Sequence, residues 1–144
     1  YLKKLPSYSY SDFEVLLILF LLFIIIKGLE NSNFFFIIGK FIEKGKYIPF
    51  KLVIITAFLA MFITNDVALL IIVPMTMLLN ITNKGFIVIL EALAANAGSA
   101  LTPFGNPQNI FIYYFYHLNF KEFFLSIYPF TLISLIIILP FAFI

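Results

Sequence analysis

Two polar stretches interrupt apolar runs in this chain, and they constrain its fold more than any other feature. The first, Thr64-Asn65-Asp66, separates two apolar runs within residues 49–80. The second, "SALTPFGNPQN", lies inside residues 85–118 and contains two prolines, which break helices. Backbone groups freed in hydrocarbon find no water, so such breaks are tolerated only where protein or a polar cavity surrounds them.

The composition indicates that the apolar runs lie in a bilayer. The chain has 144 residues, of which 63% are hydrophobic and 11% are charged, whereas about 25% are charged in a typical soluble domain. The net charge of +2 does not suggest nucleic acid as a partner. The absence of cysteine excludes disulfides, thiolate metal sites and a cysteine nucleophile. No base–nucleophile pair is present, so we predict neither an enzyme nor an organic cofactor.

The hydropathy pattern predicts an all-α, polytopic membrane protein made of one transmembrane domain over residues 1–144. Two ordinary membrane-spanning helices are expected, at residues 12–29 and 122–144. Residues 34–46 have an apolar face with lysines off it, which predicts an amphipathic helix in the membrane interface. The alternative is a capping helix packed on protein. Because the chain starts at Tyr1 and ends inside an apolar run, we expect a fragment.

Residues 49–80 are too long for one membrane span and too short for two, which need about 20 residues each. An Asp at the centre of one straight helix would cost several kcal/mol in hydrocarbon. We therefore expect a re-entrant helical hairpin with its tip at residues 64–66. The alternative is a single tilted helix with a buried, neutral Asp66.

Residues 85–118 form one span interrupted near its centre, which predicts a discontinuous helix with a break at 101–108. A broken helix leaves N–H groups at one end, which attract anions, and C=O groups at the other, which attract cations. Secondary transporters hold substrate and coupling ion at such breaks. Alternatively, the polar residues only join helices to one another.

The side chains at the two interruptions suit a binding site for ions. Amides offer both donors and acceptors, hydroxyls add further groups, and glycines let the backbone approach a ligand. These residues are the amides Asn65, Asn96, Asn106, Gln108 and Asn109, the hydroxyls Thr64, Ser99 and Thr102, and the glycines Gly98 and Gly105. Asp66 is expected to bind Na⁺ or carry a proton. Glu91 is a second ionisable participant, a carboxyl that snorkels to the lipid interface or one hydrogen-bonded between helices.

The lysines predict an orientation in the membrane. Six of them share the face from which the hairpin would enter, and three fall on the other face. The six are Lys27, Lys40, Lys44, Lys46, Lys51 and Lys84, and the three are Lys3, Lys4 and Lys121. The positive-inside rule makes the six-lysine face cytoplasmic.

Two segments, "MFITNDVALLIIVPMT" and "AANAGSALTPFGNPQNIFIY", resemble the hallmark segments of the ion transporter superfamily. The resemblance runs from about Asp12 to Tyr114 and is closest to the bacterial citrate-transporter-like anion permeases, relatives of the divalent anion/sodium symporters. The arsenite-efflux permeases share a similar "ND" hairpin. The resemblance implies two inverted repeats, each with a re-entrant hairpin and a discontinuous helix, and usually a homodimer in the bacterial inner membrane. This chain would be most of the first repeat, with the second repeat missing.

The resemblance also implies roles for individual residues. The tip Thr64-Asn65-Asp66 stands where dicarboxylate carriers have Ser-Asn-Thr, and Gly105-Asn106-Pro107 stands at the helix break that contributes to cation and substrate binding. Expected substrate-binding residues are Thr64, Asn65, Asn106, Pro107, Gln108 and Asn109. Expected coupling-ion residues are Asn65, Asp66, Ser99, Thr102 and Gly105, with Na⁺ possible at Asn65, Asp66 and Gly105. Asp66 replaces a neutral Thr of the dicarboxylate carriers, which favours involvement of a cation or proton.

These observations predict a secondary active transporter of a small anion, either a di- or tricarboxylate or an inorganic oxyanion, coupled to Na⁺ or H⁺. Its expected partners are the anion, the lipid bilayer, the second repeat and a second copy of the protein. One alternative is a Na⁺/H⁺ antiporter of the same superfamily, in which Asp66 is the exchanging carboxylate. An alternative of another class is a channel or a non-transporting membrane subunit.

Overall fold

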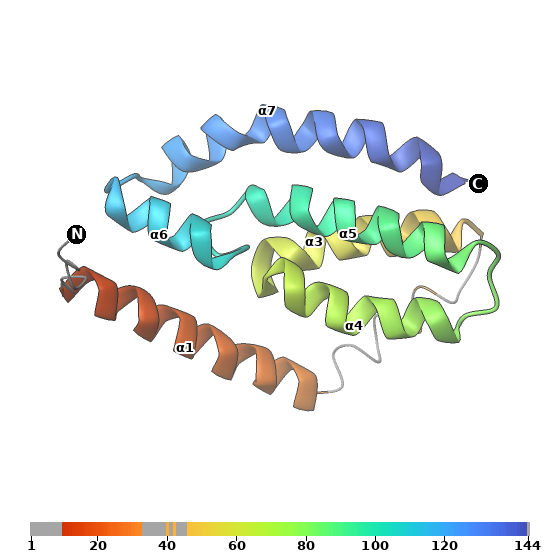
Figure 1. The fold of residues 1–144 in the computed structure, drawn as a ribbon, viewed down its shortest axis with the longest axis horizontal. Helices are drawn as coiled ribbons and strands as arrows, with labels where there is room; N and C mark the ends of the chain where they lie inside the picture. Colours follow the sequence, from red (N-terminus) through yellow and green to blue (C-terminus); the bar gives the residue numbers. More distant parts are fainter. Residues whose placement is uncertain (1–9, 33–39, 41, 43–45, 144) are drawn as a thin grey trace, which may run out of the picture.

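The structure is a computed structural model that describes residues 10–32, 40, 42 and 46–143. These residues form helices joined by short connections, with no β-strand among them (Figure 1). The α-helices are α1 (Tyr10–Asn31), α3 (Ile48–Ile63), α4 (Asn65–Leu78), α5 (Lys84–Ala100), α6 (Pro107–Phe115) and α7 (Phe120–Ile138), and the 3₁₀ helix η1 (Leu139–Phe143) follows α7. The predicted all-helical class is confirmed. The helix expected over residues 34–46 lies almost entirely outside the described residues.

Local sequence explains where several helices begin. Pro49 occupies the first turn of α3, where its missing N–H leaves no intrahelical bond unmade. A capping box starts α7: the Asn119 side chain accepts a hydrogen bond from the Glu122 N–H at 2.9 Å, and the Glu122 carboxylate accepts one from the Asn119 N–H at 3.1 Å. These starts are therefore encoded within a few residues of sequence.

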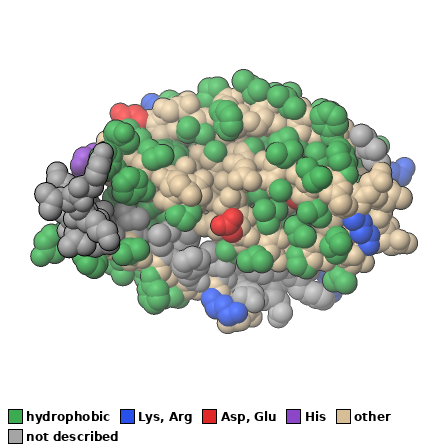
Figure 2. All heavy atoms as spheres, viewed as in Figure 1, with side chains coloured by type: hydrophobic (Ala, Val, Ile, Leu, Met, Phe, Trp, Pro, Cys, Tyr) green, Lys and Arg blue, Asp and Glu red, His purple; other side chains and the backbone are tan. Residues whose placement is uncertain are grey.

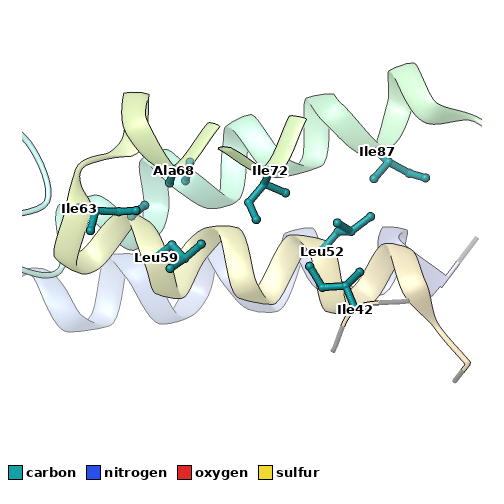
Figure 3. Packing of buried hydrophobic residues seen from close by; sticks show 9 residues of the cluster. Ile42, Leu52, Leu59, Ile63, Ala68, Ile72 and Ile87 are labelled. Carbon is teal, nitrogen blue, oxygen red and sulfur yellow. The ribbon is translucent and has the colours of Figure 1, made fainter. Parts of the chain in front are cut away.

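The helices α3 and α4 form a hairpin in which a single residue, Thr64, separates them. Because the chain reverses there, α4 runs back alongside α3 (Figure 1). Figure 3 shows Leu59 and Ile63 of α3 close to Ala68 and Ile72 of α4, and all four side chains are buried in one cluster. This packing sets the two helices antiparallel with the Thr64 turn at one end.

The helix α5 packs along both helices of the hairpin, most extensively along α3. Small residues allow the close approach, since Ala57 of α3 and Ala94 and Ala97 of α5 share a buried cluster. A Cβ atom added at Gly98 would overlap the backbone carbonyl of Ala57, so only glycine fits at that position. The close contact brings the end of α5 level with the tip of the hairpin.

The helix α7 covers α5 and α6 from the other side, running antiparallel to them (Figure 1). Its Thr131 hydroxyl donates a buried hydrogen bond of 3.1 Å to the Ala97 carbonyl of α5. Beyond it, Phe143 of η1 stacks on Phe50 at the start of α3, with ring centroids 4.5 Å apart. The C-terminal turn is thereby tied to the base of the hairpin. On the opposite side, α1 contacts α6.

The surface of the molecule is largely apolar. Figure 2 shows hydrophobic side chains spread over the described part of the visible face. Exposed large hydrophobic residues occur on α1, α4 and α7, among them Phe20, Leu70 and Phe130. Within the described part of the chain, one helical stretch, Phe120–Phe143, is long and apolar enough to cross a membrane, and α3 and α4 are apolar but shorter.

Candidate functional site

The hairpin tip is a strained turn. Thr64 has φ 74° and ψ 149° and is buried, with 6% of its surface exposed. That backbone conformation is almost restricted to glycine, and a β-branched residue adopts it at a cost of about 1–3 kcal/mol. No side chain caps α4 at this residue. The turn is therefore held by its surroundings rather than by its own sequence.

The hairpin tip packs against the second interruption, which lies between α5 and α6. The Asn65 backbone N–H, the first of α4, donates to the Gly105 carbonyl at 3.1 Å. The Asn65 side-chain amide donates to the Asn96 side-chain oxygen at 3.1 Å. Asn96 in turn donates to the Ala92 carbonyl one turn earlier on α5, at 2.8 Å. The two polar stretches, about forty residues apart in sequence, therefore meet at one junction, which we call the tip–break junction.

The break itself spans residues 101–106 and is tied to both neighbouring helices. The Thr102 hydroxyl donates to the Met61 carbonyl in the last turn of α3. A Cβ atom at Gly105 would overlap the Ser99 backbone carbonyl, so the chain folds back tightly on the end of α5. Pro103 is buried within this turn. The break is a compact, anchored loop.

Three backbone carbonyls at the end of α5 converge on a single side-chain nitrogen. Asn109 Nδ2 lies 3.0 Å from the Ser99 oxygen, 3.2 Å from the Ala100 oxygen and 2.9 Å from the Thr102 oxygen. The carbonyls of Ser99 and Ala100 belong to the last turn of α5, which leaves them without intrahelical partners. The Thr102 carbonyl follows in the break and also accepts from the Gly105 N–H at 3.3 Å. The amide donor thus occupies the electronegative end of the broken helix. An oxygen cluster of this kind has the chemistry that suits a small hard cation.

The start of α6 is the electropositive end of the same break. Asn106 caps it, because its side-chain oxygen accepts from the Asn109 N–H at 2.8 Å. Pro107 and Gln108 follow in the first turn and are exposed. The start of α4 at Asn65 is bonded to the break beside it. Two helix N-termini, each favourable for an anion, therefore lie at the junction.

Asp66 is not among the side chains that meet the break. It is exposed in the first turn of α4 and lines a shallow groove with Leu69, Leu70, Val73 and Pro74. These positions form one outward face of α4, opposite the buried residues Ala68 and Ile72. Of the expected coupling-ion residues, the structure brings together Asn65, Ser99, Thr102 and Gly105, and Asp66 stands apart on the neighbouring surface.

A groove between α5 and α7 has Asn96, the partner of Asn65, in its lining. It has a volume of about 390 Å³, and its walls are mainly apolar residues such as Leu93, Phe130 and Ile137. Its polar side chains are Asn96 and Ser134. Because Asn96 also accepts the hydrogen bond from Asn65, one side chain connects the groove with the hairpin tip. The polar character of Asn96 between alanines was visible in the sequence, but its contact with Asn65 was not.

A second polar contact joins α4 and α5 far from the tip. The Thr76 hydroxyl donates to Glu91 Oε1 at 2.5 Å, and both side chains are fully buried. The sequence left open whether Glu91 is an ionisable participant, a carboxyl that snorkels to the lipid interface or one hydrogen-bonded between helices, and the structure shows the hydrogen bond between helices. Thr76 carried no signal, because a single threonine in an apolar helix is common. Among the described residues, no three His, Cys, Asp or Glu side chains gather as metal ligands.

A helical hairpin whose tip meets a broken helix is the arrangement with which secondary membrane transporters build their binding sites. The chain belongs to the citrate transporter family (CitMHS), whose model matches residues 4–144. The predicted superfamily is thereby confirmed. No solved structure matches the chain.

Curated relatives support the same class. The chain is 38% identical to an uncharacterized transporter of Methanocaldococcus jannaschii, over 97% of this chain and 42% of that protein. It is 38% identical to the inner membrane protein YbiR of Escherichia coli, over 82% of this chain and 34% of that protein. It is 29% identical to a silicon efflux transporter of rice, over 85% of this chain and 27% of that protein. The chain spans less than half the length of these relatives.

Proposed function

We propose that the chain is the first half of a secondary active transporter that moves a small anion, a di- or tricarboxylate or an inorganic oxyanion, coupled to Na⁺ or H⁺. The observation that carries this proposal is the hydrogen bond from the Asn65 N–H to the Gly105 carbonyl. It joins the hairpin tip to the helix break, so helix ends of opposite polarity and several amide side chains share one small region.

The anion binds on the electropositive side of the junction. The starts of α4 and α6 present N–H groups there, and exposed Gln108 adds a side-chain donor. Substrate contacts are assigned to Thr64, Asn65, Asn106, Pro107, Gln108 and Asn109. Backbone and amide N–H donors bind an anion without a fixed positive charge.

The coupling ion binds on the electronegative side. The carbonyls of Ser99, Thr102 and Gly105 supply oxygen ligands. A cation that displaces the Asn109 amide would bind the three carbonyls that the amide contacts, those of Ser99, Ala100 and Thr102. Asp66 contributes from the outward face of α4 once the second half of the protein covers that face. Its charge offsets that of a bound cation.

In the membrane, α3 and α4 act as a re-entrant hairpin. With 16 and 14 residues they are about 24 and 21 Å long at 1.5 Å per residue, less than the roughly 30 Å hydrocarbon core. The tip therefore lies within the core, where the junction supplies its polar partners. The whole protein is a multi-pass protein of the bacterial inner membrane. It has a second, inverted repeat and forms a homodimer.

The family is named for citrate, which is a tricarboxylate and so falls within the proposed substrate class. The test uses the full-length protein in proteoliposomes with radiolabelled citrate, succinate or phosphate, and with an imposed Na⁺ or H⁺ gradient. Uptake should saturate with substrate and depend on one of the two gradients. Flux that neither saturates nor responds to a gradient would show a channel instead.

The junction is tested with Asn65→Ala, which removes the side-chain bond to Asn96 and one proposed substrate donor. We expect the KM for the transported anion to rise about tenfold, the effect of losing one hydrogen bond to a charged group. Asn80→Ala is the matched control, because Asn80 is exposed in the turn after α4. An unchanged KM in Asn65→Ala would remove the tip from the substrate site.

The exposure of Asp66 supports one second candidate, a Na⁺/H⁺ antiporter. A carboxylate on an open face of α4 is accessible to a cation without any anion at the junction. Sodium-driven proton flux in proteoliposomes that contain no transportable anion would favour the antiporter. Loss of that flux in Asp66→Asn would assign the exchange to this carboxylate.

A further inference from the structure

Glu91 is a carboxyl side chain enclosed within the helical core, away from the tip–break junction. It has no exposed surface. On α5 it lies one turn from both Ile87 and Ala95, which belong to the buried cluster shared with Ile72 of α4. Figure 3 shows Ile72 and Ile87 within this cluster. The carboxyl group is therefore set among apolar side chains at the α4–α5 interface.

Only one of the two carboxyl oxygens is bonded. Oε1 accepts from the Thr76 hydroxyl at 2.5 Å. Oε2 is buried and has no hydrogen-bond partner among the residues that the structure describes. An ionised carboxylate is an acceptor at both oxygens, and a buried charge with an unsatisfied oxygen is far more costly than a neutral acid.

Among the described residues, the charged side chains of the surrounding helices form no hydrogen bond with Glu91. They are Lys51 on α3, Asp66 on α4, Lys84 on α5, and Lys121 and Glu122 on α7. Lys84 donates to the Met77 carbonyl at 2.8 Å, and Asp66 is ten residues from Thr76, about 15 Å along α4. Lys121 and Glu122 are exposed at the start of α7, at its far end from the α5 residues near Glu91. The site therefore fits a carboxylic acid with its proton on Oε2.

We propose that Glu91 is a proton-binding residue of the transporter, which holds its proton while α4 is packed on α5 and releases it when this interface opens to water. The inference rests on the proposed function and adds to it a coupling residue outside the tip and the break. Its bond to Thr76 joins the middle of α5 to the C-terminal half of the helix that forms the tip. Release of the proton while the helices are packed would leave an unpaired negative charge on Glu91 between α4 and α5. Loss of the proton therefore favours separation of the two helices, and their separation favours loss of the proton.

Infrared spectroscopy of the full-length protein tests the proton directly. A neutral carboxylic acid gives a carbonyl band that a carboxylate lacks. We expect such a band in the wild type and its loss in Glu91→Gln. In Thr76→Val the band should shift to higher wavenumber, because the carbonyl oxygen Oε1 loses its donor. A wild-type spectrum identical in this region to that of Glu91→Gln would overturn the proposal.

Proteoliposomes test the role in transport, with citrate, succinate or phosphate as the substrate and a pH indicator inside the vesicles. We expect Glu91→Gln to move the anion without moving a proton at this residue, so proton flux per anion falls and the pH dependence of transport flattens. Thr76→Val should transport more slowly but keep the wild-type ratio of protons to anions. An unchanged ratio in Glu91→Gln would overturn the proposal.

Glu122→Gln is the matched control, because Glu122 is exposed and glutamine also completes a capping box. It should keep both the infrared band and the proton ratio. If Glu91→Gln does not fold, the band shift in Thr76→Val decides between a neutral acid and a carboxylate. If the wild type transports none of the three anions, the proposed function fails, and the infrared spectra still decide whether Glu91 binds a proton.

Discussion

The two interruptions at the junction are built in opposite ways. The tip is a single residue, Thr64, in a strained conformation with no side-chain cap. The break is six residues long, and side chains of the break and of α6 hold it: Asn106 caps α6, Asn109 of α6 contacts three carbonyls, and Thr102 bonds to α3. The tip therefore depends on hydrogen bonds from the break, whereas the break is fixed by several side-chain hydrogen bonds of its own region.

This asymmetry suggests which part moves. A strained turn whose hydrogen bonds are made to a neighbouring segment can change conformation when that segment binds an ion. A loop tied to α3, α5 and α6 at once is a rigid platform. We therefore expect substitutions in the break to lower stability and substitutions in the tip to alter transport. The following changes test that difference.

The largest loss of stability is expected from Asn109→Asp. The amide of Asn109 has two N–H donors, which the carbonyls of Ser99, Ala100 and Thr102 share. Losing two hydrogen bonds at about 1 kcal/mol each, with added repulsion between the carboxylate and the carbonyl oxygens, costs more than about 2 kcal/mol. Thermal unfolding of the full-length protein in detergent measures this loss of stability. Asn106→Asp is the control, because aspartate caps a helix as well as asparagine does. Equal melting temperatures for the two variants would contradict a break fixed by these hydrogen bonds.

Gly105→Ala should have an intermediate effect. The added Cβ overlaps the Ser99 carbonyl, and forcing an atom into a packed turn costs about 2 kcal/mol. The same change at Gly85 is the control, because a Cβ there meets nothing within 4 Å and alanine favours a helix. Thermal unfolding of both variants measures the difference. A Gly105→Ala protein as stable as Gly85→Ala would show that the turn is loose.

Thr64→Gly should have the smallest effect on stability, and of opposite sign. Glycine adopts the backbone conformation of the tip without strain, so we expect a gain of about 1 kcal/mol. Thr82→Gly, in the loop between α4 and α5, is the control and should be neutral or slightly destabilising. If strain in the tip helps the turn to change conformation during transport, Thr64→Gly transports more slowly although the protein is more stable. A destabilised Thr64→Gly protein with normal transport would contradict the asymmetry.

Much of the fold follows from local sequence. Long apolar runs predict helices, Pro107 and its polar neighbours predict a break, and the "TND" stretch predicts a turn between two short helices. The structure is all-helical in its described residues, and the chain belongs to the family that its two motifs resemble. The assigned roles of the site residues stay predictions.

Other features could not be read from sequence, because they depend on which faces of the helices meet. Thr76 and Glu91 are 15 residues apart, and Thr102 and Met61 are 41 apart. Asp66 and Asn65 are adjacent in sequence, yet the Asn65 side chain contacts Asn96 of α5 and Asp66 faces outward, because successive helical residues point about 100° apart.

The sequence by itself determined the helices and their interruptions, because hydropathy and helix breaking act over a few neighbouring residues. It also determined the amides and hydroxyls that replace water at the interruptions. Only the packing of the helices decided which groups form hydrogen bonds with one another. The fit of Gly98 against Ala57 sets the height of α5 beside the hairpin. That height brings the Asn65 N–H to the Gly105 carbonyl and the Thr76 hydroxyl to Glu91, because hydrogen bonds form only within about 3 Å.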